Sequence, residues 1–476
     1  MSRSPLSAQP PQPSRRANRS RAAASRITAV TSRLTASAGL LDPSVLAVLD
    51  RQLRRIEWRD HAQTLAARLQ NADLPPDRAR QLGRRLALRG AHPNAVRFGL
   101  LLLSLAGTDE DREILTDLGL RPAFSSEACE ALARSQSDPH RALFELARRA
   151  EGWARVDAVR HLEGARDPEI GTWLIREACT GDVLDSYVAL TAARVGDLAA
   201  VLSGESLDVE TLDGAARLLE ALTDVDGPGP ALRQYADAVR ALTGYLRHVT
   251  AQSLTLPRLW TLLTVHRFLQ DGRVDALCAT DHDWRRVRDR YARAVADPAA
   301  RRVVLAGLDA EEQSTLRLAA WAATRMGLPV RPTLLRRVES HPYDTALWFL
   351  LVDGCPSEDI AAVVEAARRV LPLQDLRGGP TEPGPGTDDA IDGVLDIIVS
   401  RLDGHPGHGW ELVETALHHR TSRNRRMAVR AIEDWPAAAL PPEARRALLD
   451  AAAREPLAEL RAELSRAAER LCGPRP

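Results

Sequence analysis

One short phrase, an aspartate followed by a proline, recurs ahead of amphipathic segments and constrains the fold of this chain more than any other feature. An N-cap aspartate accepts hydrogen bonds from the free amides of a first helical turn, and a proline in that turn has no amide to leave unsatisfied. The phrase therefore predicts the beginnings of α-helices. It stands at Asp42-Pro43, Asp138-Pro139, Asp167-Pro168 and Asp297-Pro298, with Glu455-Pro456 as a looser version.

The segments behind these phrases carry apolar residues at helical spacing. One stripe, at i, i+3, i+4 and i+8, consists of Ile170, Trp173, Leu174 and Ala178. Residues at this spacing share one face of a helix. A further helix is expected to open at Asp309, with Glu312 three residues on as in a capping box, and to stop at Gly327. These patterns predict amphipathic helices that each bury one face.

Such helices continue for more than 400 residues without a convincing strand pattern, and alanine, leucine and arginine dominate the composition. They must therefore stack in pairs or gather into a bundle, and an aromatic content of only 4% favours stacking. The last hundred residues predict two helical hairpins, with helices over 410–419, 424–435, 442–454 and 457–471. The chain thus resembles HEAT-type repeats, whose units of about 40 to 47 residues would give roughly nine or ten copies. We predict an all-α fold, a HEAT-like α-solenoid of stacked antiparallel helix pairs.

The domain organisation follows from composition. Residues 1–41 contain seven arginines and no acidic residue, which predicts a disordered basic arm, with an arm that binds nucleic acid or an acidic partner, or a targeting segment, as alternatives. The stretch "RGGPTEPGPGTDD" predicts a Gly/Pro linker over residues 373–389. The linker would join a main helical-repeat body, residues 42–372, to a C-terminal helical-repeat module, residues 390–476.

Charge and cysteine usage narrow the class of protein. Lysine is absent, so all 64 basic residues are arginine, and the phosphate-loop, protein-kinase and Schiff-base lysines are excluded. The 64 acidic residues balance them, which leaves no overall field that would attract nucleic acid or a membrane. The five cysteines form no C-x-x-C pair, as expected of a reduced cytoplasmic protein. The longest apolar run, 98–106, is far below the roughly 20 residues of a membrane span.

No motif for catalysis, cofactor binding or metal binding emerges. The nearest approach to a nucleophile elbow, Gly204 to Asp208, lacks the second glycine. None of the twelve histidines follows a glutamate by three residues, and the one H-x-E match, at His161, is expected by chance. We therefore predict no catalytic, cofactor-binding or metal-binding residue and no cofactor.

Two arginine-rich helices are the candidate interaction surface. In "RNRRMAVRAIEDW", Arg423, Arg426 and Arg430 project opposite an apolar stripe. They could clamp phosphates or carboxylates, although Glu433 and Asp434 follow on the same polar side and could neutralise them. In the second helix, the candidates are Arg286, Arg290 and Arg293, around a stripe of Trp284, Val287 and Tyr291.

The stretch "EGWARVDAVRHLEGARDPEIGTWLIREA", residues 151–178, resembles a family of bacterial helical-repeat proteins often labelled limonene hydroxylase. "RMAVRAIEDW" is similar to a second segment of that family, and the chain departs from the pattern at Ala154 and Gly171. The resemblance supports the fold, and the label implies an oxidoreductase. Hydroxylation of a hydrocarbon needs haem, flavin or non-haem iron, whose signatures are not visible in the sequence. Three tryptophans are predicted to anchor the core: Trp153, Trp173 and Trp435.

The function predicted from these features is that of a non-enzymatic cytoplasmic scaffold, in which stacked helix pairs present an extended surface to an unidentified protein partner. Two alternatives remain open. One is an oxidoreductase that matches the family label, and the other is a HEAT-like nucleic-acid-binding protein that uses its arginine faces.

Overall fold

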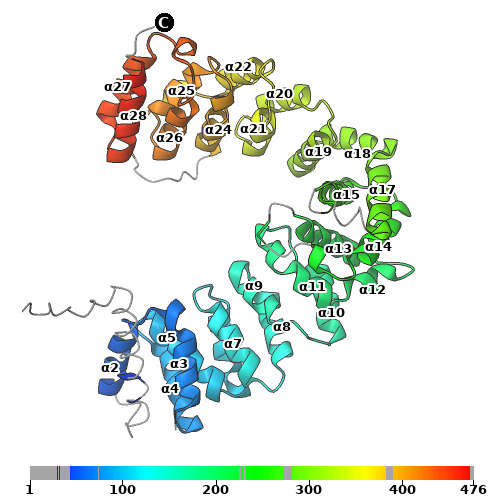
Figure 1. The fold of residues 1–476 in the computed structure, drawn as a ribbon, viewed down its shortest axis with the longest axis vertical. Helices are drawn as coiled ribbons and strands as arrows, with labels where there is room; N and C mark the ends of the chain where they lie inside the picture. The colour runs from blue at the N-terminus through cyan, green and yellow to red at the C-terminus, as the bar shows by residue number, and fades with distance from the viewer. Residues whose placement is uncertain are drawn as a thin grey trace, which may run out of the picture. The chain divides into compact units, whose positions relative to one another are not determined.

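The computed structural model describes residues 43–72, 74–224, 232–271, 281–381 and 390–471, with residues 29, 30, 32, 227, 228 and 274 between them. Within these residues the secondary structure is helical, with no β-strand (Figure 1). The prediction of an all-α fold is confirmed. No helix in the described ranges combines the length and the apolar character that a bilayer crossing requires.

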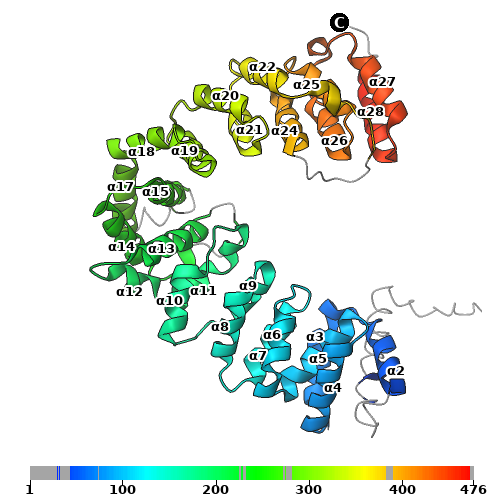
Figure 2. The same cartoon turned by 180° about the vertical axis from the view of Figure 1, so that it is seen from behind.

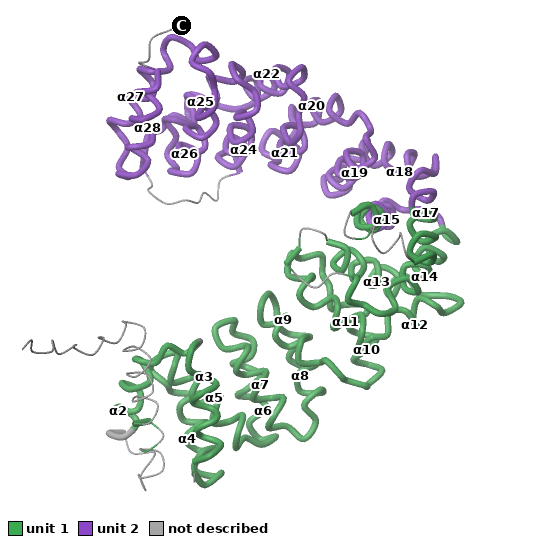
Figure 3. Tube along the Cα trace, in the orientation of Figure 1, with its two compact units in different colours: residues 1–252, 264–291 green, residues 253–263, 292–476 purple. Residues whose placement is uncertain are grey.

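The chain divides into two compact units (Figure 3). Unit 1 comprises residues 1–252 and 264–291, and unit 2 comprises residues 253–263 and 292–476. The division runs through α15 (Leu256–Leu269) and α17 (His282–Val295). The predicted linker, 373–389, falls inside unit 2 instead: residues 382–389 lie outside the described residues, and residues 373–376 form a short helix.

Many helices of unit 1 pack against the next helix in the sequence, as α4 does on α5, α6 on α7 and α8 on α9, whereas α10 packs on α13, with α11 and α12 between them in the chain (Figure 2). The bounds of these helices are α2 (Pro43–Leu53), α3 (Trp58–Gln70), α4 (Pro76–Arg89), α5 (Pro93–Ala106), η1 (Asp109–Asp111), α6 (Arg112–Gly119), α7 (Ser125–Ser135), α8 (Pro139–Arg149), α9 (Gly152–Arg160), α10 (Pro168–Glu177), η2 (Val183–Tyr187), α11 (Ala189–Val195), α12 (Leu198–Ser203), α13 (Val209–Leu222), η3 (Leu232–Gln234) and α14 (Ala238–Thr250).

Unit 2 follows the same rule, with α18 packed on α19, α20 on α21, α25 on α26 and α27 on α28. The bounds are α18 (Pro298–Leu308), α19 (Gln313–Arg325), α20 (Arg331–Ser340), α21 (Thr345–Val352), α22 (Ile360–Val370), α23 (Leu373–Leu376), α24 (Ala390–Val399), η4 (Leu402–Gly404), α25 (Trp410–Leu417), α26 (Ser422–Ala431), η5 (Ala437–Ala439), α27 (Ala444–Arg454) and α28 (Ala458–Arg470). The four helices predicted in the last hundred residues are confirmed within a few residues at each end.

The Asp-Pro phrases begin helices as predicted wherever the structure describes them. The carboxylates of Asp138, Asp167 and Asp297 accept hydrogen bonds from first-turn amides at 3.0, 2.8 and 2.7 Å, and the proline that follows each is in the first turn. Asp42 lies outside the described residues. The local chemistry of the phrase is therefore sufficient to locate a helix start.

The helix predicted to open at Asp309 begins later. Glu312 is its N-cap and accepts from the amides of Ser314 and Thr315 at 3.2 and 2.8 Å, whereas Asp309 ends the preceding helix, α18. The glutamate side chain reaches the same amides as a shorter capping residue would. The sequence therefore offered two acidic residues, Asp309 and Glu312, as the N-cap, and Glu312 is the one that caps the helix. The predicted stop is confirmed, because Gly327 takes a φ of 65°, a left-handed conformation that favours glycine.

Several polar contacts between neighbouring helix pairs have sequence separations close to 30 residues, and others reach 35 to 38. In unit 1, Arg80 donates to Asp111 across 31 residues, and Arg176 donates to Asp208 across 32. In unit 2, the separations are 28 residues from Arg331 to Asp359 and 30 residues from Arg425 to Glu455. The starts of α8 at Pro139 and α10 at Pro168 agree, being 29 residues apart. This spacing is shorter than the 40 to 47 residues expected from the sequence.

Buried apolar side chains form the core of each unit. In unit 1, one cluster gathers Leu49, Leu53, Phe98 and their neighbours, and it includes Val30, which is fully buried. The basic arm predicted for residues 1–41 lies outside the described residues except at 29, 30 and 32, which are helical. One apolar position of that arginine-rich stretch, Val30, therefore packs into the core.

Of the three tryptophans predicted to anchor the core, two are buried. Trp173 is 6% exposed and Trp435 is 4% exposed, whereas Trp153 is 49% exposed. Ala154 and Ala158 mark the buried face of α9, and Trp153 lies one position, about 100°, away from that face. Its ring packs at the surface against Tyr187, with the ring centroids 4.9 Å apart and the ring planes tilted by 55°.

Truncation of the two unit 1 tryptophans should separate these roles. Trp173→Ala is expected to lower the free energy of unfolding by about 3–5 kcal/mol because it leaves a cavity. Trp153→Ala should cost no more than about 1 kcal/mol, since half of its ring already faces solvent. Urea unfolding followed by circular dichroism would measure both. Equal losses would contradict the assignment of Trp153 to the surface.

Candidate interaction site

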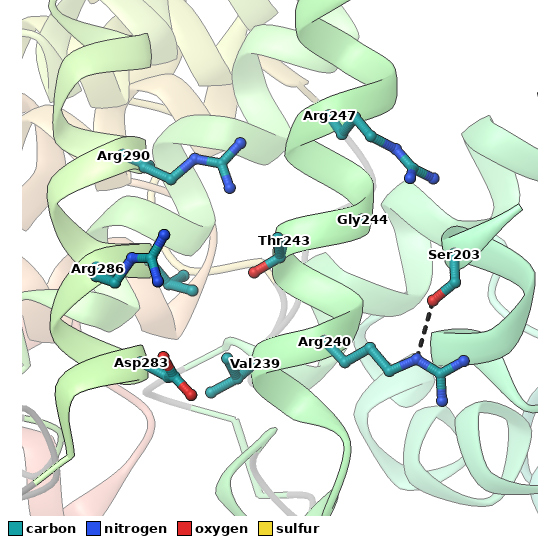
Figure 4. Close-up of a pocket in the computed structure, with 10 residues that line it drawn as sticks. Ser203, Val239, Arg240, Thr243, Gly244, Arg247, Asp283, Arg286 and Arg290 are labelled. Carbon is teal, nitrogen blue, oxygen red and sulfur yellow. Dashed lines mark hydrogen bonds between the residues drawn. The ribbon is translucent and has the colours of Figure 1, made fainter. Parts of the chain in front are cut away.

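The position of the arginines predicted on α17 is set by the packing of that helix against α14. Trp284, Val287 and Tyr291 are buried as predicted. The Tyr291 hydroxyl donates to the carbonyl of Leu242 in α14 at 3.0 Å. Because this stripe faces the core, the opposite side of α17 carries Arg286 and Arg290 toward open space beside α14 (Figure 4).

Four arginines of unit 1 line a hollow of about 340 Å³, here named the arginine hollow. Arg286 and Arg290 come from α17, and Arg240 and Arg247 come from α14. The complete lining is Ser203, Val239, Arg240, Thr243, Gly244, Arg247, Asp283, Arg286, Val287 and Arg290. The structure thus brings together two of the predicted residues and two that the sequence analysis missed.

The two α14 arginines are held by neutral acceptors. The Nε atom of Arg240 donates to the Ser203 hydroxyl at 2.9 Å. A guanidinium nitrogen of Arg247 donates to the carbonyl oxygens of Leu202 and Gly204 at 3.1 and 2.5 Å. These contacts orient the guanidinium groups without neutralising their charge.

The two α17 arginines have no acidic partner within the described residues. Arg286 and Arg290 are four residues apart, so their side chains leave the helix from adjacent turns. The lining contains one carboxylate, Asp283, against four guanidinium groups, which leaves an excess of three positive charges. The hollow can therefore attract an anion and donate several charge-assisted hydrogen bonds to it. Arg293, predicted with this pair, is exposed on the same helix and does not line the hollow.

The second predicted surface is neutralised by its neighbours. The apolar stripe of α26 is buried as predicted, and the side chains of Arg423, Arg426 and Arg430 are exposed. Arg423 donates to Asp396 at 2.8 Å. Arg426 and Arg430 line a groove in unit 2 that contains two more arginines and four carboxylates, so its charges balance: Arg426, Arg430, Arg466, Arg470, Glu433, Asp434, Glu463 and Glu469.

A buried polar network lies beside this groove and was not predicted. Arg425 is 2% exposed and donates to the Glu455 carboxylate at 2.7 and 3.1 Å. The same guanidinium donates to the carbonyl oxygens of His419 and Arg420 at 2.9 and 2.7 Å. The signal was present, because Arg425 precedes Ala428 and Ile432 by three and seven residues and so shares their buried face.

His419 completes the network. Its Nδ1 atom accepts from the amide of Thr421 at 3.1 Å, so its Nε2 atom is protonated and donates to the Asp392 carboxylate, with the nitrogen and oxygen 3.0 Å apart. Burial lowers the pKa of His419, against the opposing effect of the Asp392 carboxylate. The imidazole is therefore a neutral structural link between α24 and the start of α26.

The described ranges contain no group of three or more histidine, cysteine, aspartate or glutamate side chains arranged to hold a metal ion. The described cysteines, Cys129, Cys179 and Cys355, are unpaired and buried. Burial raises the pKa of each thiol, so these side chains are poor nucleophiles.

Comparisons with known proteins add little to this geometry. No protein-family model matches the chain, and no curated protein matches it. A solved structure of an engineered protein covers 94% of this chain and 99% of its own, at 16% sequence identity and a TM-score of 0.24. A TM-score this low carries no argument about fold or function.

Proposed function

We propose that the chain is a non-enzymatic helical-repeat scaffold, an α-solenoid that is HEAT-like in its stacked helix pairs but has shorter units, and that these pairs bind a protein partner. The observation that carries the proposal is that several side-chain contacts between neighbouring helix pairs, in both units, have sequence separations of 28 to 32 residues. A helix pair that buries one face against each neighbour leaves its remaining flank exposed. Stacked pairs then offer an extended surface, which is how repeat proteins bind their partners.

Charge supports a protein partner over nucleic acid. The groove between α26 and α28 carries four arginines and four carboxylates, and the whole chain has a net charge of zero. A nucleic-acid surface needs a continuous run of unneutralised cations along the phosphate backbone. The three cysteines that the structure describes are unpaired and buried, which is compatible with a reducing, cytoplasmic location.

The test is affinity capture combined with crosslinking, and its design follows from the absence of lysine. Amine-reactive crosslinkers cannot attach to the side chains of this protein, so a dihydrazide that joins carboxylates is required. The tagged full chain is expected to retain one protein in near-stoichiometric amount from an extract of its native cells. Untagged folded chain should displace that protein, and heat-denatured chain should not.

A protein retained under these conditions should crosslink repeatedly to carboxylates on exposed helices of the described residues. If no protein is retained in stoichiometric amount, or if denatured chain displaces it equally well, the scaffold proposal is wrong. Because the readout is a protein partner, this result is independent of whether a small anion binds the arginine hollow.

A further inference from the structure

The geometry of unit 1 points to an anion site: we infer that the arginine hollow binds a phosphate monoester through Arg286 and Arg290, with Arg240 and Arg247 adding positive charge along its lining. This inference goes beyond the scaffold proposal and does not rest on it. The hollow belongs entirely to unit 1, since α12, α14 and residues 283–290 of α17 supply all of its lining. The site is therefore complete within one compact unit.

The wall of the hollow consists mainly of hydrogen-bond donors. Guanidinium groups have N–H donors and no acceptor, and four of them line the hollow. The hydroxyl of Ser203 is already engaged, because it donates to the Ala199 carbonyl at 2.6 Å and accepts from Arg240. The single carboxylate, Asp283, lies at one end beside Val239. Such a wall suits a ligand that is rich in acceptor oxygens and carries negative charge.

A phosphate monoester fits the charge better than a carboxylate does. The excess of three positive charges exceeds what one carboxylate can neutralise. A phosphate monoester carries about −1.5 to −2 charges near pH 7 and offers three acceptor oxygens. Arg286 and Arg290, on adjacent turns of α17, can each donate two parallel hydrogen bonds to such a group.

The local character of the cluster argues for a single anionic group. The hollow has a volume of about 340 Å³, which accommodates a phosphate and a few attached atoms. The acceptors described above hold Arg240 and Arg247 toward residues 202–204. Arg286 and Arg290 are therefore the side chains that would contact the anion directly.

The phosphate could be that of a phosphorylated side chain on a protein or that of a small free ester, and calorimetry distinguishes them. The probes are inorganic phosphate, a pentapeptide of four glycines around one phosphoserine, and the same peptide with glutamate. All are titrated into the full chain at one ionic strength. We expect at least one phosphate probe to bind saturably, about tenfold or more tighter than the glutamate peptide. Tighter binding of the phosphopeptide than of inorganic phosphate indicates a protein side chain, and the reverse indicates a free ester.

The matched variants are the double substitutions Arg286→Gln with Arg290→Gln, and Arg301→Gln with Arg302→Gln. The second pair lies exposed on α18, outside the hollow, and removes the same charge. The first pair should weaken phosphate binding by about tenfold or more, while the second leaves it within about twofold. Unchanged unfolding curves would show that both variants fold. The inference is overturned if neither phosphate probe saturates, if glutamate binds equally well, or if both variants lose binding alike.

Discussion

Replacement of Glu455 by alanine is expected to lower the free energy of unfolding of unit 2 by about 3–5 kcal/mol. Glu455 is 2% exposed, and its carboxylate holds the Arg425 guanidinium in a buried ion pair. The alanine variant leaves that guanidinium with carbonyl partners but no counter-charge. The same substitution removes the acceptor for the amide of Leu457 ahead of α28. Urea unfolding of the full chain, followed by circular dichroism, would measure the loss.

Two controls identify the cause. Replacement of both partners, Arg425→Met with Glu455→Leu, should restore most of the stability because no buried charge is left. Asp450→Ala breaks the exposed pair with Arg446, in which the two side chains are 88% and 54% exposed, and should cost less than about 1 kcal/mol. If Glu455→Ala costs no more than Asp450→Ala, the buried pair does not stabilise unit 2.

Trp348→Ala is expected to cost a similar amount, about 3–5 kcal/mol, for a different reason. Trp348 is fully buried in the core of unit 2, and its Nε1 atom donates to the Pro342 carbonyl at 2.7 Å. Truncation removes the ring from α21 and leaves both a cavity and an unpaired carbonyl oxygen.

Trp348→Phe is the matched variant, because it keeps most of the apolar volume and loses only the ring nitrogen. Its free energy of unfolding should fall by less than half as much as that of Trp348→Ala, as measured by urea unfolding under the same conditions. If the two variants are equally destabilised, the volume of the ring is not what supports α21.

The features that the sequence predicted well are those decided within one helical turn. Asp138, Asp167 and Asp297 cap helices because the capping interaction spans only two or three residues. The buried stripe of α17 follows from periodicity in the same way. The helical spacing of the apolar residues, together with the capping residues, therefore accounts for the helices and for their buried faces.

The features that the sequence could not predict depend on which helices meet. Arg286 and Arg290 were recognised as an exposed pair, but Arg240 and Arg247 join them only because α14 packs beside α17. Arg240 and Arg247 are seven residues apart on one face of α14, a signal that gains meaning only with that packing. Likewise, helical periodicity places Arg425 on the buried face of α26, but its partner, Glu455, is 30 residues away and could not be identified from that pattern. Pairing between helices, rather than helix formation, limited the prediction of the site.

The central claim, that helix pairs stack one after another and bury their faces mainly against sequence neighbours, is tested most directly by hydrogen exchange in Trp348→Ala, resolved by mass spectrometry. In a stacked array, stability is a sum of local terms, so exchange should accelerate most in α20, α21 and α24 and fade toward α27 and α28. Equal acceleration of the slowest amides across all of unit 2 would instead indicate a single cooperative core and would contradict the claim.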